Sequence, residues 1–384
     1  MVTTADIEAA RVRLRGSIYE SPCAYSQTLS ELTGARCFVK LENLQMTGSF
    51  KERGAANLLL QLGADERPRG VVAASAGNHG LAVAFHAKRL GIRATIVMPD
   101  AAPLVKVTSA RRYGAEVILA GASYDEAYTG AREIERERGL VFVHPFDDER
   151  VIAGQGTLGL EILEQRPDVD AVLVPLGGGG LVAGVATALK AGRPNMRVIG
   201  VHAKELPTIA DGIAVRERGV LTSEVIRQRV DDIVQVGEEE IANAILLLLE
   251  IEKTVVEGAG ATTLAALVNR PLRLAGATVV LVLSGGNIDV TMLSRIIQRG
   301  LVKDGRLARL AVVLVDRPGA LARLTALIAE SRANILHIEH DRAFSRAGVG
   351  ESEVELTLET SGPAQIEEIK SRLRSTGYRV EDKS

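Results

Sequence analysis

The chain has 384 residues, of which 46% are hydrophobic and 24% are charged, and its formal net charge is −2. This apolar content suffices for a large core and excludes a disordered chain, while the near-neutral charge gives no broad basic surface for nucleic acid. The sequence has neither a signal-peptide core at its N-terminus nor an apolar run near the ~20 residues of a membrane helix. We therefore expect a cytoplasmic protein.

Short β-rich runs alternate with helical stretches between about residues 70 and 300. Their apolar residues do not alternate strictly with polar ones, which is typical of strands covered on both faces. This pattern predicts parallel α/β layers. The expected strands are 71–74, 94–98, 116–119, 141–143, 171–174, 198–201, 233–236 and 278–283.

The pattern changes after a polar, glycine-containing segment at residues 303–306, which we interpret as a linker. A strand at 310–315 is expected next, then a helix with Leu321, Leu324 and Ile328 on one face. Strands at 334–340 and 353–359, a helix at 364–373 and a strand at 378–380 complete the order βαββαβ. This order predicts a ferredoxin-like antiparallel sheet with helices on one face.

Three loops that follow expected strands contain small and polar residues: 75–80 (SAGNHG), 177–180 (GGGG) and 284–287 (SGGN). Ligands bind outside the carboxyl ends of parallel strands, so these loops are candidate sites. Four successive glycines that open a helix indicate a phosphate site. A dinucleotide site is not favoured, because the strand that follows ends at His202 without an acidic residue. Taken singly, the loop 75–80 is more typical of an ordinary capped turn, and the loop 284–287 is equally typical of an ordinary turn and of a ligand site.

Lys51 is one of only ten lysines and lies in the segment 47–53 (TGSFKER). A lysine with an aromatic neighbour can have its ammonium desolvated, which lowers its pKa and makes it a Schiff-base former. Most single lysines are simply solvated. A reactive lysine, a phosphate loop and a hydroxyl at a third strand end are together what pyridoxal phosphate requires.

The sequence resembles the threonine dehydratases (threonine ammonia-lyases), which are pyridoxal-phosphate enzymes of the tryptophan-synthase-β-like class, fold type II. The matching motifs occur in family order over roughly residues 5–300. They are 42–51 (ENLQMTGSFK), 75–80, 177–180, 208–212 (TIADG), 255–260 (VVEGAG) and 284–287. Residues 316–320 (DRPGA) and 333–335 (ANI) resemble an ACT domain, a module that commonly binds amino acids.

The resemblance implies a role for each matching residue. Lys51 is expected to carry the cofactor covalently and to remove the Cα proton of the substrate. Ser75, Ala76, Asn78 and His79 are expected to bind the substrate carboxylate through backbone and side-chain donors. The expected cofactor ligands are Phe50 against the ring, Asn78 at the ring hydroxyl, Ser284 at the pyridine nitrogen, and Gly177, Gly178, Gly179, Gly180 and Leu181 at the phosphate.

The resemblance also implies the domains: a catalytic domain at 1–302, with a small subdomain inserted at about 45–150, and an ACT regulatory domain at 306–384. Between residues 205 and 208 the chain is shorter than family members usually are, near a cation site of some relatives. We therefore assign no metal.

The expected reaction is elimination of L-threonine and L-serine to 2-oxobutanoate or pyruvate and ammonia. Serine racemases of this class carry a serine where this chain has Ala76. A methyl group cannot deliver a proton, which favours dehydration. The alternatives are serine racemase or a related dehydratase, a β-replacement enzyme, and a catalytically idle amino-acid sensor. The ACT module predicts isoleucine or valine binding between the ACT domains of a homodimer or homotetramer.

Overall fold

The computed structural model describes residues 1–342 and 347–383, which form two compact units, Met1–Ile288 and Asp289–Ser384. The boundary lies before the helix at 290–303, whereas the sequence places the end of the catalytic domain at 302. Within the described residues, no helix is long and apolar enough to cross a membrane.

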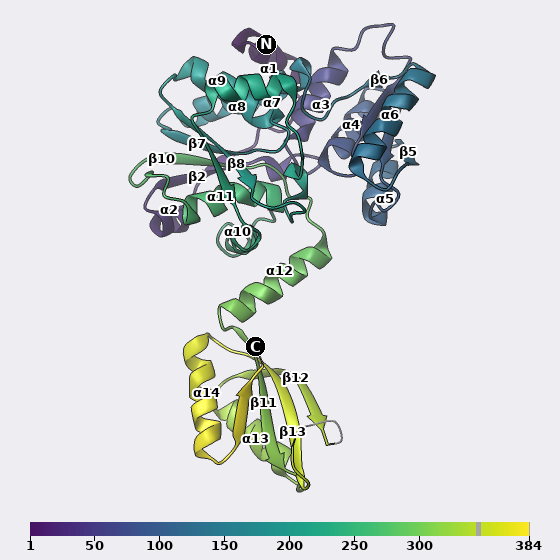
Figure 1. The fold of residues 1–384 in the computed structure, drawn as a ribbon. Coiled ribbons are helices and arrows are strands. Elements are labelled where there is room, and N and C mark those ends of the chain that lie inside the picture. Colours follow the sequence, from purple (N-terminus) through teal and green to yellow (C-terminus); the bar gives the residue numbers. More distant parts are fainter. Residues whose placement is uncertain (343–346, 384) are drawn as a thin grey trace. The chain divides into compact units, whose positions relative to one another are not determined.

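The first unit contains a six-stranded sheet and a four-stranded sheet, each flanked by helices (Figure 1). The larger sheet has the order β1-β2-β10-β7-β8-β9 and is parallel except for β1. Its strands are β1 (Cys23–Tyr25), β2 (Arg36–Leu41), β7 (Ala171–Pro175), β8 (Arg197–Ala203), β9 (Asp232–Val236) and β10 (Thr278–Leu283). The sequence predicted β7 to β10 but not β1 and β2, which lie before the region with the alternating pattern.

Helices cover both faces of this sheet, which explains its continuous apolar strands. Val172 and Val280 pack with helices α7 and α8 in one core cluster. Helix α11 contacts strands β7 to β10. The accompanying helices are α1 (Thr4–Leu14), α2 (Gln27–Thr33), η1 (Glu42–Leu44), α3 (Lys51–Leu60), α7 (Glu149–Gln165), α8 (Gly180–Gly192), η2 (Asp211–Ile213), α9 (Val220–Arg229), α10 (Glu238–Ile251) and α11 (Gly258–Asn269).

The smaller sheet is wholly parallel, with the order β5-β4-β3-β6. Its strands are β3 (Val71–Ala74), β4 (Ala94–Met98), β5 (Glu116–Leu119) and β6 (Val141–Phe142), and its helices are α4 (Asn78–Arg89), α5 (Leu104–Arg112) and α6 (Tyr124–Arg138). All four strands lie where the sequence predicts them. The sheet places the loop 75–77, between β3 and α4, at the carboxyl end of a parallel strand.

The second unit begins with α12 (Val290–Lys303) and contains an antiparallel sheet of order β12-β13-β11-β14. Val354, Leu356 and Leu358 are buried, and both α13 and α14 contribute to the same core cluster. The elements are β11 (Leu307–Val315), α13 (Ala320–Glu330), β12 (Asn334–Asp341), β13 (Glu351–Glu359), α14 (Pro363–Ser375) and β14 (Arg379–Asp382). This is the predicted βαββαβ fold.

Candidate active site

Lys51 is the first residue of α3, and its half-buried side chain reaches the loop that follows β6. Its Nζ donates a hydrogen bond of 2.8 Å to the main-chain oxygen of Pro145 and lies 5.3 Å from the centroid of the Phe50 ring. Burial lowers the pKa of Lys51 to about 8, although the nearby Glu257 acts in the opposite direction. The neutral amine, which is the nucleophilic form, is therefore accessible near neutral pH.

The tetraglycine loop (residues 177–180) joins β7 to α8 and packs against the loop that contains Phe146. Gly179 has a φ of +96°, a conformation that disfavours a side chain. A Cβ at Gly178 would overlap the ring of Phe146. Because Phe146 follows Pro145, one short loop contacts both the amine of Lys51 and the tetraglycine loop. Leu181, next in α8, is buried.

The loop after β3 leads directly into α4, whose first residue is Asn78. The first N–H groups of a helix lack partners within it, so this end favours an anion such as a carboxylate. Ser75 Oγ accepts a hydrogen bond of 3.2 Å from the N–H of Gly77, and Ala76 is half-buried. This arrangement places the four expected carboxylate ligands around one helix N-terminus.

His79 is buried, and its Nε2 is 2.8 Å from the main-chain oxygen of Val143, while its Nδ1 has no hydrogen-bond partner. Burial, reinforced by the charge of Lys51, lowers its pKa to about 3. The ring is therefore neutral at physiological pH. Since the ring is held at the end of β6, the expected carboxylate binding is left to the main-chain N–H of His79.

The end of β10 lies against the start of α3. The N–H of Phe50 donates a hydrogen bond of 3.0 Å to the oxygen of Ser284, and that of Gly286 donates one of 2.9 Å to Gly48. Ser49 and Gly285 form an isolated antiparallel bridge. Ser284 is buried beside these contacts. Segments more than 230 residues apart in sequence thus form one wall of the site.

Two features of the site were missed from the sequence. The first is the loop 144–147 (HPFD), in which Asp147 also accepts hydrogen bonds from Val220 and Thr222 at the start of α9. The second is Glu257, whose Oε1 lies 2.7 Å from Asn78 Nδ2. Both follow from signals that the sequence contains: the first loop follows a predicted strand, and Glu257 lies within the motif 255–260.

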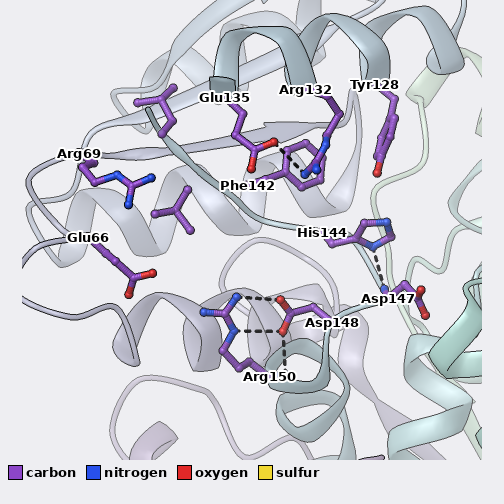
Figure 2. A pocket seen from close by; sticks show the side chains of 12 residues that line it. Glu66, Arg69, Tyr128, Arg132, Glu135, Phe142, His144, Asp147, Asp148 and Arg150 are labelled. Atoms are coloured by element: carbon purple, nitrogen blue, oxygen red, sulfur yellow. Dashed lines mark hydrogen bonds and ion pairs between the residues drawn. The ribbon is translucent and has the colours of Figure 1, made fainter. Parts of the chain in front are cut away.

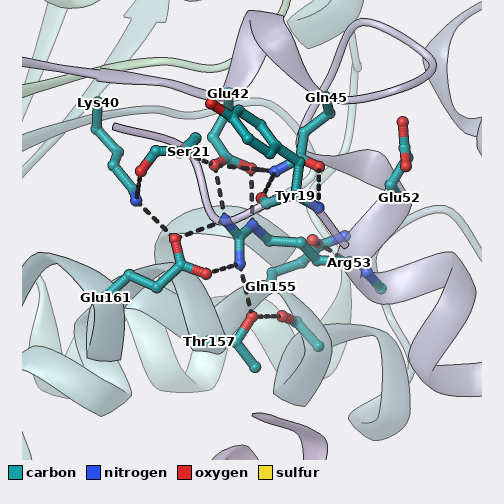
Figure 3. Close-up of polar contacts among 12 residues, drawn as sticks. Tyr19, Ser21, Lys40, Glu42, Gln45, Glu52, Arg53, Gln155, Thr157 and Glu161 are labelled. Atoms are coloured by element: carbon teal, nitrogen blue, oxygen red, sulfur yellow. Dashed lines mark hydrogen bonds and ion pairs between the residues drawn. The ribbon is translucent and has the colours of Figure 1, made fainter. Parts of the chain in front are cut away.

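A buried network of ions anchors the start of α3 at Arg53 (Figure 3). The guanidinium of Arg53 binds both oxygens of Glu42, at 2.7 and 2.8 Å, and both oxygens of Glu161, at 2.6 and 2.9 Å. Lys40 Nζ also binds Glu161, at 2.6 Å. These carboxylates raise the pKa of Arg53 further above its usual value, despite burial. The network joins β2, η1, α3 and α7, and so holds the helix that carries Lys51.

A separate hollow of about 510 Å³ lies beside β6 and α6, lined by His144 and Asp147 but not by Lys51 (Figure 2). Four of its charged groups form two ion pairs: Arg150 pairs with Asp148, and Arg132 with Glu135, each at 2.8 Å. His144 Nδ1 accepts hydrogen bonds from the N–H groups of Phe146 and Asp147. The residues that line this hollow therefore hold the loop 144–147 in place, and we do not assign the hollow as an alternative active site.

The residues present fit pyridoxal phosphate. A buried amine with a lowered pKa suits attachment to an aldehyde, and a glycine loop that opens a helix suits a phosphate. Among the described residues, no cluster of three or more histidine, cysteine or acidic side chains could hold a metal ion. In the segment before α9, Ile213 packs against Gly177.

Comparison with known proteins agrees with this geometry. Residues 14–285 match the family described as pyridoxal-phosphate dependent enzyme, and residues 308–377 match the ACT domain. An L-threonine ammonia-lyase of Thermotoga maritima is 49% identical, with 99% of each chain covered. One of Geobacter sulfurreducens is 48% identical, with 98% of each chain covered.

Solved structures are similar to the first unit. A threonine deaminase from T.th. has a TM-score of 0.71 and 42% identity, covering 75% of this chain and 99% of that chain. Maize serine racemase has a TM-score of 0.73 and 34% identity, covering 79% of this chain and 98% of that chain.

Proposed function

The chain belongs to the family of pyridoxal-phosphate dependent enzymes and carries an ACT domain, and we infer that it is an L-threonine ammonia-lyase. The reaction converts L-threonine to 2-oxobutanoate and ammonia. The observation that carries this inference is the end-to-end similarity to L-threonine ammonia-lyases, combined with the Lys51 amine beside the tetraglycine loop. L-serine, which would yield pyruvate, is the second expected substrate.

The cofactor, when bound, supplies the electron sink that makes the Cα proton of an amino acid removable. Lys51 would hold it covalently, Phe50 would pack against its ring, and Asn78 and Ser284 would bind the ring hydroxyl and the pyridine nitrogen. The main-chain N–H groups of the tetraglycine loop and of Leu181 would bind the phosphate at the start of α8. A serine at the pyridine nitrogen need not keep that nitrogen protonated, which suits a fast elimination.

The substrate is oriented by its carboxylate at the N-terminus of α4, where Ser75, Ala76, Asn78 and His79 are its ligands. The neutral amine of Lys51, when it is not engaged with the cofactor, would take up the Cα proton as general base. The methyl group of Ala76 would offer no acid to the reacting carbon. Without such an acid, reprotonation at Cα is disfavoured and loss of the β-hydroxyl prevails over racemisation.

Residues 306–384 form the proposed regulatory module. Isoleucine or valine binds between ACT domains of a homodimer or homotetramer, near Gly319 and Asn334, and changes the activity. Such an effector is chemically related to the product of threonine deamination, which supports a role in isoleucine biosynthesis. The ACT match and the glycine at the start of α13 support this assignment.

The test is a steady-state assay of the full chain with L-threonine, L-serine and O-acetylserine side by side, titrated with isoleucine. Release of 2-oxobutanoate and ammonia from threonine is expected. Preference for O-acetylserine with a thiol would instead identify a β-replacement enzyme. Formation of D-serine without keto acid would identify a racemase.

A further inference from the structure

Two amides and one carboxylate form a chain of hydrogen bonds across the candidate active site. Asn287 Nδ2 donates to the main-chain oxygen of Thr47 and to Asn78 Oδ1, each at 2.7 Å. Asn78 Nδ2 in turn donates to Glu257 Oε1, also at 2.7 Å. The chain links the loops after β2 and β10 with the starts of α4 and α11.

The direction of these hydrogen bonds follows from the first of them, which joins Asn287 to Thr47. The main-chain oxygen of Thr47 can only accept, so the amide nitrogen of Asn287 must face it. The second hydrogen on that nitrogen then requires an acceptor, which is Asn78 Oδ1. Asn78 therefore has to turn its own nitrogen toward Glu257. If Asn78 were flipped, its oxygen would face a carboxylate and its N–H groups would face those of Asn287.

Glu257 is held in place at the other end of this chain of hydrogen bonds. It is buried, and its N–H donates a hydrogen bond of 2.9 Å to the oxygen of Gly285. A Cβ at Gly285 would overlap its carboxylate, so a glycine at 285 is what leaves room for Glu257. Burial and the neighbouring charge of Asp211 raise the pKa of Glu257 to about 7, while Asn78 and Lys106 oppose this shift.

We propose that Glu257 is a positioning residue that acts through Asn78, and that Asn287 sets the direction in which the hydrogen bonds of this chain are donated. With its oxygen and one hydrogen engaged, the Asn78 amide has one N–H left, so it acts as a donor toward the cofactor. This proposal rests on the proposed function, in which Asn78 binds the ring hydroxyl. A donor there stabilises the ionised ring oxygen, whereas a flipped amide would present an acceptor and destabilise it.

The experiment compares Asn287→Asp and Glu257→Gln with the wild type in the full chain. An aspartate at 287 can only accept, so the Asn78 nitrogen is expected to turn away from Glu257. Glutamine at 257 still accepts from Asn78 but without charge. The matched control is Glu137→Gln, which makes the same chemical change on the exposed side of α6.

Three quantities are measured: the visible absorbance of the bound cofactor across pH, its dissociation constant by equilibrium dialysis with apoprotein, and kcat and KM for threonine. In Asn287→Asp we expect the pH midpoint of the absorbance change to shift. We also expect cofactor binding to be roughly tenfold weaker and kcat to be roughly tenfold lower. A smaller shift in the same quantities is expected for Glu257→Gln, and none for Glu137→Gln. A purely structural role would lower the melting temperature without moving the midpoint.

The proposal is overturned if both active-site variants keep the wild-type midpoint and dissociation constant, whatever happens to their activity. If Asn287→Asp does not fold, the isosteric Glu257→Gln decides the question by the same readouts. A wild type that binds the cofactor but leaves threonine unchanged would refute the proposed function. The absorbance and binding measurements would still test the role of Glu257 in that case.

Discussion

The amine of Lys51 and the main-chain oxygen of Pro145 are joined by a hydrogen bond of 2.8 Å across 94 residues of sequence. The next residue, Phe146, packs on the tetraglycine loop. Two consecutive residues, Pro145 and Phe146, thus connect the amine of Lys51 to the tetraglycine loop. The first two predictions follow from this relationship.

Lys51→Ala should abolish the absorbance of covalently bound cofactor and lower threonine turnover by at least about 10³-fold, because both attachment and proton removal need the amine. Absorbance spectra and a keto-acid assay measure the two effects. The matched control is Lys190→Ala, which removes a lysine of α8 that pairs with Asp231, and this variant should be active. Bound-cofactor absorbance that survives in Lys51→Ala without added amine would contradict the assignment.

The rate of cofactor attachment to the apoprotein should rise with pH and level off above about 8, the pKa to which burial lowers Lys51. The neutral amine attacks, and its fraction grows about tenfold per pH unit below the pKa. Stopped-flow absorbance after mixing with pyridoxal phosphate measures the rate. A rate that continues to rise to about pH 10 would show an unshifted, solvated lysine.

Arg53→Met should destabilise the protein by about 3–5 kcal/mol, because it leaves the buried carboxylates of Glu42 and Glu161 without their shared partner. Urea unfolding monitored by circular dichroism measures the change. Arg138→Met is the matched control: it breaks an exposed pair with Glu116 and should cost about 0–1 kcal/mol. Equal effects of the two substitutions would refute the anchoring role of the network.

Ala76→Ser should gain racemase activity toward L-serine, because it adds a hydroxyl to the loop that leads into α4. Chiral chromatography of the reaction mixture detects D-serine, and the keto-acid assay reports the remaining elimination. The unsubstituted chain is the control and should form keto acid with little D-serine. Failure to detect D-serine from the variant would mean that residue 76 does not face the cofactor ring.

Isoleucine or valine should raise the melting temperature of the full chain and change its rate with threonine. Gly319→Ala should weaken both responses, because Gly319 has a φ of +83° at the start of α13 and a side chain there is strained. Gly377→Ala is the matched control, with a φ of +93° in the turn before β14. If the two variants respond alike, or if neither amino acid affects the wild type, the site is misplaced.

Much of the fold could be predicted from local pattern. The apolar runs at 71–74 and 278–283 are strands, and the alternation of Val354, Leu356 and Leu358 marks a strand with one buried face. Strands β1 and β2 escaped prediction. In β2 the fully buried Lys40 interrupts the apolar run, and its burial is made tolerable by partners that include Glu161, which is distant in sequence.

The sequence by itself determined the residue types that chemistry needs: Lys51 beside Phe50, four successive glycines, and a serine at the end of a strand. These signals are local, because a turn or a helix start depends on a few neighbouring residues. The tertiary structure alone decided which groups meet. Asn78 and Glu257 are 179 residues apart, and Arg53 and Glu161 are 108 apart. A buried charge or amide takes its protonation state and orientation from such distant partners, and only the packed chain brings them within hydrogen-bonding distance.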